Sequence, residues 1–166
     1  MTGLDKIREC VCRCLTEAGI NAVTAWSKEE KKRHNGPVAA VSLRTCEGGP
    51  GGFQDYLGER YNAESHRWEE LYGKRVRFTF GLDIYSAARD GAAECQQVFD
   101  RIAEVFQSGM PAGLKLESLS REETAYDEQL GLFRCAVEAV CSAYLYAVAE
   151  EDGTFVDFEV RGERKE

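Results

Sequence analysis

The chain has 166 residues, of which 43% are hydrophobic and 30% charged, and its formal net charge is −8. This length and composition predict one globular domain, 1–166, that buries an ordinary core, and they argue against disorder. No apolar stretch approaches the roughly 20 residues that cross a bilayer. The net negative charge argues against a protein that binds nucleic acid tightly, because contacts with phosphates dominate the affinity for nucleic acids.

The first third of the sequence predicts a helix followed by two strands. Residues 4–18 have an amphipathic pattern without a signal-peptide core, so we expect a protein that is cytoplasmic where it is made. Gly19 supplies the helix stop. Residues 20–26 and 37–46 have strand patterns. The polar stretch 27–36 between them ends in a turn signal, which favours a hairpin with a long basic tip.

Residues 47–73 are the least regular part of the sequence. A glycine-rich run is followed by many aromatic side chains, and the spacing of Trp68, Leu71 and Tyr72 permits a short helix over 64–72. The simplest prediction is a long loop, a kind that is uncommon in compact domains unless it has a function. Two interpretations stay open: an insertion folded over its own core, or an arm that packs on a neighbouring subunit.

The clearest local patterns follow. Strict alternation over residues 74–85 predicts a strand with one apolar face. Residues 92–107 predict an amphipathic helix with Asp90 as its N-cap and Gly109 near its end.

The last third of the sequence predicts strands. A short strand covers 114–119, and an acidic turn over 121–128 leads into a long strand, 130–148, for which a helix is the competing prediction. A last strand, 154–160, precedes a frayed tail, 161–166. The resulting order, α-β-β-(long loop)-β-α-β-β-β, predicts an α+β fold, an antiparallel or mixed sheet with two helices packed on one face.

The cysteines and histidines do not predict a metal site. Seven cysteines in a chain without a signal peptide are expected to be reduced thiols. Cys10, Cys12 and Cys14 resemble a cluster, but helical residues two apart point about 200° away from each other. No CxxC motif occurs, and His34 and His66 fall in loop-like segments. We therefore predict structural thiols, no metal and no cofactor.

The sequence also lacks recognisable catalytic motifs. The glycine-rich run precedes an aromatic segment instead of a helix N-terminus, and Gly73-Lys74 has no matching upstream glycine, so neither forms a phosphate-binding loop. Adjacent carboxylates such as Glu122 and Glu123 are typical of a solvated surface, with an acidic face turned toward DNA as the alternative. These observations predict a protein that is not an enzyme.

Taken in order, these segments resemble the tail terminator and related tail-completion proteins of long-tailed bacteriophages and prophages. The resemblance runs from about residue 4 to residue 160 and rests on order and spacing. Its parts are the opening helix, Tyr56-Leu57-Gly58, Glu70-Leu71-Tyr72-Gly73, a strand ending Leu82-Asp83-Ile84-Tyr85, the helix with Cys95, Phe99 and Ile102, and Tyr126-Asp127 before a strand beginning around Leu132.

This resemblance implies a structural virion protein that forms a hexameric ring on the tail tube and joins it to the head connector. Its partners would be copies of itself, the tube protein and the connector protein, and no membrane is involved. DNA would pass through the ring without being gripped. The protein would be cytoplasmic during assembly and part of the virion tail afterwards. In isolation, both a ring and a monomer are compatible with this role.

Two sets of residues are candidates for these contacts. Aromatic side chains are enriched at interface cores, so the oligomer-interface candidates are Phe53, Tyr56, Tyr61, Trp68 and Tyr72. The candidates for an acidic partner surface, with a solvated turn as the alternative, are Lys28, Lys31, Lys32 and Arg33.

Other functions fit the same pattern. One is another phage component, such as a head–tail joining protein or a tube protein. A different class is a small host domain that binds a ligand or a protein in a pocket between sheet and helices.

Overall fold

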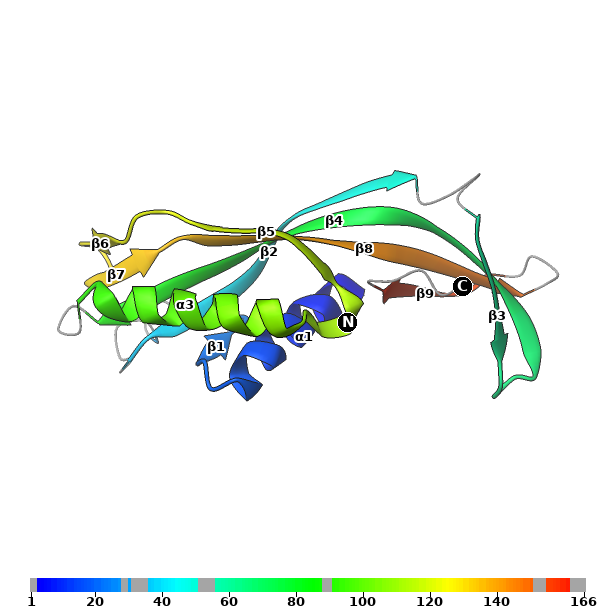
Figure 1. Cartoon of the computed structure of the whole chain (residues 1–166), viewed down its shortest axis with the longest axis horizontal. Helices are drawn as coiled ribbons and strands as arrows, with labels where there is room; N and C mark the ends of the chain where they lie inside the picture. The colour runs from blue at the N-terminus through cyan, green and yellow to red at the C-terminus, as the bar shows by residue number, and fades with distance from the viewer. Residues whose placement is uncertain are drawn as a thin grey trace.

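The computed structural model describes residues 3–27, 30, 36–50, 56–87, 91–150 and 155–161. The strands within these ranges form one nine-stranded sheet, and the long helices lie against one face of it (Figure 1). The elements are α1 (Gly3–Glu17), β1 (Ala22–Val23), β2 (Val38–Pro50), β3 (Tyr56–Asn62), β4 (Arg67–Ala87), α3 (Ala93–Ser108), η2 (Pro111–Gly113), β5 (Lys115–Arg121), β6 (Ala125–Asp127), β7 (Leu132–Cys135), β8 (Val137–Glu150) and β9 (Phe155–Arg161). The predicted α+β class and element order are confirmed.

Strand β4 is the spine of the sheet. Its 21 residues extend over about 70 Å at roughly 3.3 Å per residue. On one side β4 pairs with β3 and then β2, and on the other side with β8 and then β7. Beyond these, β9 and β5 pair with β8, and β6 pairs with β7. These pairings are antiparallel and the β1–β2 pairing is parallel, so the sheet is mixed.

The core lies between the helices and one face of this sheet. Side chains alternate along a strand, and on β4 the face turned toward the helices carries Phe78, Phe80, Leu82 and Ile84, each 0% exposed. The helices cover it with Ile7, Val11 and Leu15 from α1 and Cys95, Ile102 and Phe106 from α3. The predicted packing of both helices on one face is confirmed.

In the middle of the sheet, the opposite face is polar and is cross-linked by ion pairs. Arg44 spans three strands, with one guanidinium nitrogen 2.8 Å from Asp83 and another 2.7 Å from Glu138. Arg134 approaches the second oxygen of Asp83 at 2.8 Å. Arg44 crosses β4 over Gly81, where an added Cβ would lie 2.5 Å from the Arg44 Nε.

Gly81→Ala is therefore expected to destabilise the fold by about 1–2 kcal/mol, because the added methyl group displaces the Arg44 guanidinium from its two ion pairs. The matched control is Gly48→Ala in β2, where the added Cβ would meet its nearest neighbour, a Val76 methyl carbon, at an ordinary 3.8 Å. Urea unfolding followed by tryptophan fluorescence measures both changes. Equal stabilities for the two variants would contradict the steric role given to Gly81.

The predicted hairpin between residues 20–26 and 37–46 is wrong. The first strand shrinks to Ala22–Val23 and runs parallel to β2. The chain leaves the sheet edge after Val23, and Trp26 packs edge-on against Tyr85 with the ring centroids 5.0 Å apart. This aromatic contact holds Trp26 away from the hydrogen-bonded edge of the sheet, and the strand ends at Val23.

The prediction of a long loop over 47–73 is corrected in the described part of that segment. Strand β2 continues to Pro50, and β3 and the first third of β4 form a hairpin. The predicted helix over 64–72 is also wrong. Cross-strand pairing with β3 and β8 satisfies the backbone of this segment from both sides, which a local apolar spacing does not reveal.

The last third of the chain is divided more finely than its pattern suggests. The acidic turn contains β6, and the long strand breaks at Ala136 into β7 and β8, where the chain leaves the β6–β7 pair. The break is stabilised by the Glu122 amide, which donates to the Ala136 carbonyl at 2.9 Å. The α3 helix begins after Ala92, which makes no side-chain cap, and the predicted cap Asp90 lies outside the described residues. The predicted frayed tail, 161–166, is wrong at Arg161, which ends β9, and residues 162–166 lie outside the described residues.

Candidate protein-protein interface

The β3–β4 hairpin lies at one end of the sheet, beyond the two helices (Figure 1). Its turn is closed by Asn62, whose side-chain oxygen accepts hydrogen bonds from the Glu64 and Ser65 amides at 2.9 and 3.2 Å. His66 completes the turn with a φ of 54°, a left-handed conformation. The hairpin is thus locally defined although no helix lies beneath it in the view of Figure 1.

One face of the hairpin carries two aromatic pairs with two carboxylates between them. We call this face the aromatic ladder; it consists of Tyr56, Glu59, Tyr61, Trp68, Glu70 and Tyr72. By strand alternation, its β4 members point to the same side of β4 as the core residue Phe78. The ladder is therefore the continuation of the core face past the end of the helical layer.

The aromatic side chains of the ladder contact one another but stay accessible. The Tyr56 and Tyr72 rings meet edge-on at 5.4 Å, and the Tyr61 and Trp68 rings at 5.6 Å. Tyr61 is 51% exposed, Trp68 49% and Tyr56 37%. These are three of the five large hydrophobic side chains found exposed in the described residues. Exposed aromatic side chains gathered on one surface are typical of a protein interface.

The centre of the ladder is negatively charged. Glu59 stands directly opposite Glu70 across the two strands, an arrangement in which like charges repel. The Tyr72 hydroxyl donates to Glu70 at 2.8 Å, and this hydrogen bond is the main cause that raises the pKa of Tyr72. Desolvation, followed by the charges of Glu59 and Glu70, raises the pKa of Tyr56. A cationic group from a partner would relieve this repulsion.

The other face of the hairpin is held by a buried carboxylate. Glu69 is 5% exposed, and it accepts from the Arg60 Nε at 2.9 Å and from the Asn62 side-chain amide at 2.8 Å. Both partners lie on β3, so the network ties the two strands together. A charge-assisted network of this kind gives the hairpin a fixed shape.

Arg60→Met is expected to cost about 1–2 kcal/mol, because it removes the guanidinium that faces a buried carboxylate and keeps the aliphatic stem. The change should appear as faster amide hydrogen exchange in β3. The double variant Arg60→Met/Glu69→Gln should recover most of the protection, since the carboxylate that lost its guanidinium partner is then replaced by a neutral amide. If the double variant exchanges as fast as the single one, the loss comes from packing and not from charge.

The predicted interface residues are partly brought together. Tyr56, Tyr61, Trp68 and Tyr72 lie on the aromatic ladder. Phe53 and the basic candidates Lys28, Lys31, Lys32 and Arg33 lie outside the described residues. Sequence reasoning missed Glu59 and Glu70, because it predicted a loop or a short helix here and not the hairpin whose register places the two carboxylates opposite each other.

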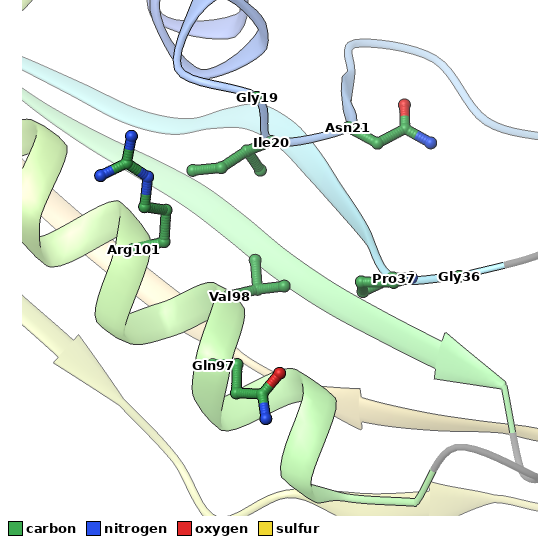
Figure 2. Close-up of a pocket in the computed structure, with 8 residues that line it drawn as sticks. All are labelled: Gly19, Ile20, Asn21, Gly36, Pro37, Gln97, Val98 and Arg101. Carbon is green, nitrogen blue, oxygen red and sulfur yellow. The ribbon is translucent and has the colours of Figure 1, made fainter.

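A cavity of about 380 Å³ lies between the N-terminal half of α3 and the segments that flank β1 and β2 (Figure 2). Ile20 and Val98 supply apolar surface, and Gln97 and Arg101 supply polar groups. Arg101 already pairs with Glu104 at 3.0 Å and donates to the Ala18 carbonyl at 3.3 Å. Its guanidinium is therefore engaged at the wall, and the cavity does not present a convergent polar set.

A second depression lies at the opposite end of the sheet from the hairpin. Its lining includes Glu122, Glu123, Asp127, Glu128 and Arg134. No cluster of three His, Cys, Asp or Glu residues in the described ranges has the arrangement of a metal site. The depression is an acidic, solvated surface.

The buried thiols are poor nucleophiles. Burial raises the pKa of Cys141 to about 12, and desolvation is also the main cause that raises the pKa of Cys95. Since the thiolate is the reactive form, these environments suppress thiol chemistry.

Cys141 is expected to resist a thiol reagent such as DTNB at pH 8, because a pKa of about 12 instead of 9.0 lowers its thiolate fraction about a thousandfold. Cys46 is exposed and should react first. Because burial raises the folded-state pKa of Cys141, keeping this thiol protonated in the core stabilises the fold. That stabilisation is complete below about pH 9.0 and is lost as the pH rises toward about 12. Rapid labelling of Cys141 in the folded chain would contradict its burial.

None of the helices in the described ranges is long and apolar enough to cross a membrane. No protein-family model matches this sequence, and a search of curated proteins finds no similar sequence.

Proposed function

We propose that this chain is a structural subunit that assembles with copies of itself into a ring, and that the ring caps a bacteriophage tail tube and joins it to the head connector. The observation that carries self-assembly is the aromatic ladder, a continuation of the core face that no helix of its own chain covers in Figure 1. The assignment to a phage tail rests on the family resemblance in the order of the segments.

The direction of the strands supports association side by side. In the middle of the sheet, β2, β4, β8 and β5 lie next to one another, each antiparallel to its neighbour. The two outer strands therefore run in opposite directions. A second copy in the same orientation would place its β2 antiparallel to β5 of the first, with the helices of both copies on one side. Such a heterologous contact repeats until the ring closes.

The outer strands also lie at matching positions along the spine. Thr45, Thr79, Val140 and Ser118 occupy one register position across β2, β4, β8 and β5. In the described residues, β5 pairs with β8 alone, and β2 beyond Ala40 pairs with β4 alone. Each outer strand thus offers backbone groups that a neighbouring copy can pair with.

The same match holds at the hairpin end of the sheet. Tyr56, Tyr72, Ala147 and Phe158 occupy one register position across β3, β4, β8 and β9. Side-by-side association would therefore bring β9 of one copy to the outer edge of β3 in the next, beside the aromatic ladder.

Light scattering over a concentration series tests this function, with and without the purified tail-tube protein of the same phage or prophage, identified by gene neighbourhood. We expect a discrete ring, either in the isolated protein or on capped tubes of limited length. Long stacks of the isolated protein would identify a tube protein instead. A monomer or a closed dimer that ignores the tube protein would overturn the proposal and favour a host binding domain.

A further inference from the structure

We infer that the first two turns of α1 from a second copy of this chain cover the aromatic ladder, with Leu4 against the tyrosine rings and Arg8 facing Glu59 and Glu70. This inference rests on the proposed self-assembly and adds the surface that the hairpin meets. It explains two incomplete surfaces, one on the sheet and one on α1, by a single contact.

The apolar stripe of α1 continues past its own core. Leu4, Ile7, Val11 and Leu15 follow helical spacing, and the last three are between 0% and 3% exposed. Leu4 is 38% exposed, although it belongs to the same stripe. Its side chain is thus available at the helix end, just as the ladder is available past the end of the helical layer.

Arg8 provides charge complementarity next to this leucine. It lies one turn after Leu4, so the two side chains are neighbours on the helix surface. Its described ion pair, to Asp5 at 3.4 Å, is long and partly exposed, and its Nε is buried without a hydrogen-bond partner in the described residues. Guanidinium groups form strong charge-assisted hydrogen bonds to carboxylates, and Glu59 and Glu70 place two carboxylates directly opposite each other on the ladder.

The N-terminal end of α1 adds a second favourable electrostatic contribution. A helix N-terminus carries a partial positive charge, which stabilises nearby anions. Here it would face Glu59 and Glu70, whose mutual repulsion within one copy is otherwise unfavourable.

The placement of α1 allows this contact. The helix packs against the sheet face that carries the ladder, contacts β9, and has its N-terminal end beside β9 in Figure 1. Side-by-side association places β9 of one copy next to β3 of another. The first turns of α1 would then lie beneath the neighbouring hairpin and not beneath their own.

Photo-crosslinking between isotopically distinct copies tests the inference. Copies with p-benzoylphenylalanine in place of Leu4 are mixed with unsubstituted ¹⁵N-labelled copies, assembled under the conditions that light scattering identifies, and irradiated. We expect mixed-isotope crosslinks from position 4 to the peptide containing residues 56–72. The matched control places the same probe at Arg13, an exposed position away from the apolar stripe, which should not label that peptide.

The outcomes separate the inference from the proposed function. Rings that form without crosslinks to the hairpin would overturn the α1 contact and leave self-assembly standing. A chain that stays monomeric with and without tube protein would overturn both. A charge exchange adds an independent measurement: Arg8→Glu and Glu70→Arg should each weaken association about tenfold, and the double variant should recover most of the loss. No recovery would mean that these two residues do not meet.

Discussion

Replacing Tyr56 and Trp68 together with serine is expected to weaken self-association by a factor of roughly 100 to 1,000. Buried aromatic anchors at interfaces commonly contribute on the order of 2 kcal/mol each. These residues supply one ring of each aromatic pair, and they are 37% and 49% exposed in the single chain. Sedimentation velocity over a concentration series measures the change, and circular dichroism verifies that the hairpin variant remains folded.

Tyr126→Ser is the matched control for this experiment. Tyr126 is 49% exposed, as Trp68 is, and it also meets a neighbouring ring, Phe133, edge-on at 5.3 Å. It lies on β6, at the opposite end of the sheet (Figure 1). An equal loss of association in both variants would show that general surface hydrophobicity, and not the aromatic ladder, drives assembly.

Phe80→Ala is expected to lower the free energy of unfolding by about 3–5 kcal/mol, the range for a large aromatic side chain removed from a rigid core. Phe80 is 0% exposed in the centre of β4, between the β2 and β8 pairings. A loss of this size is a large share of the roughly 5–15 kcal/mol that stabilises a domain, so the variant should unfold at much lower urea concentration.

Thr79→Ala provides the comparison for the core variant. Thr79 is the preceding residue of β4 and points to the polar face of the sheet by strand alternation. Its replacement should change the free energy of unfolding by less than about 1 kcal/mol. Similar losses at the two positions would contradict the assignment of the even-numbered β4 face to the core.

Two stretches of one face of β4 connect these predictions. Up to about Val76 the face with Phe80 is closed by α1 and α3. Toward Trp68 the same face is aromatic and open. We therefore expect core substitutions to act on folding and substitutions in the aromatic ladder to act on assembly, although both sets of β4 side chains lie on the same face of one continuous strand.

Local periodicity in the sequence by itself determined the two helices, the strand over residues 74–85, and the face of that strand which enters the core. The stripe containing Ile7, Val11 and Leu15 and the alternation through Phe78 and Phe80 are local signals, set by 3.6-residue and 2-residue repeats. The structure confirms both. Composition also identified four aromatic members of the ladder, because aromatic density does not depend on where the strands pair.

Only the tertiary structure decided which segments pair and in what register. The parallel β1–β2 contact follows from where the chain returns to the sheet, which no local pattern records. Segment 56–72 forms a hairpin whose second strand also pairs with β8, more than 70 residues away, and a local pattern does not record that partner. The opposition of Glu59 and Glu70 follows from the hairpin register, which pairs Asn62 with Arg67, and a shift of one residue would have moved one carboxylate to the other face. The aromatic spacing over 64–72 permits a helix when it is considered locally, so neither the hairpin nor the charge at the centre of the candidate interface could be read from that pattern.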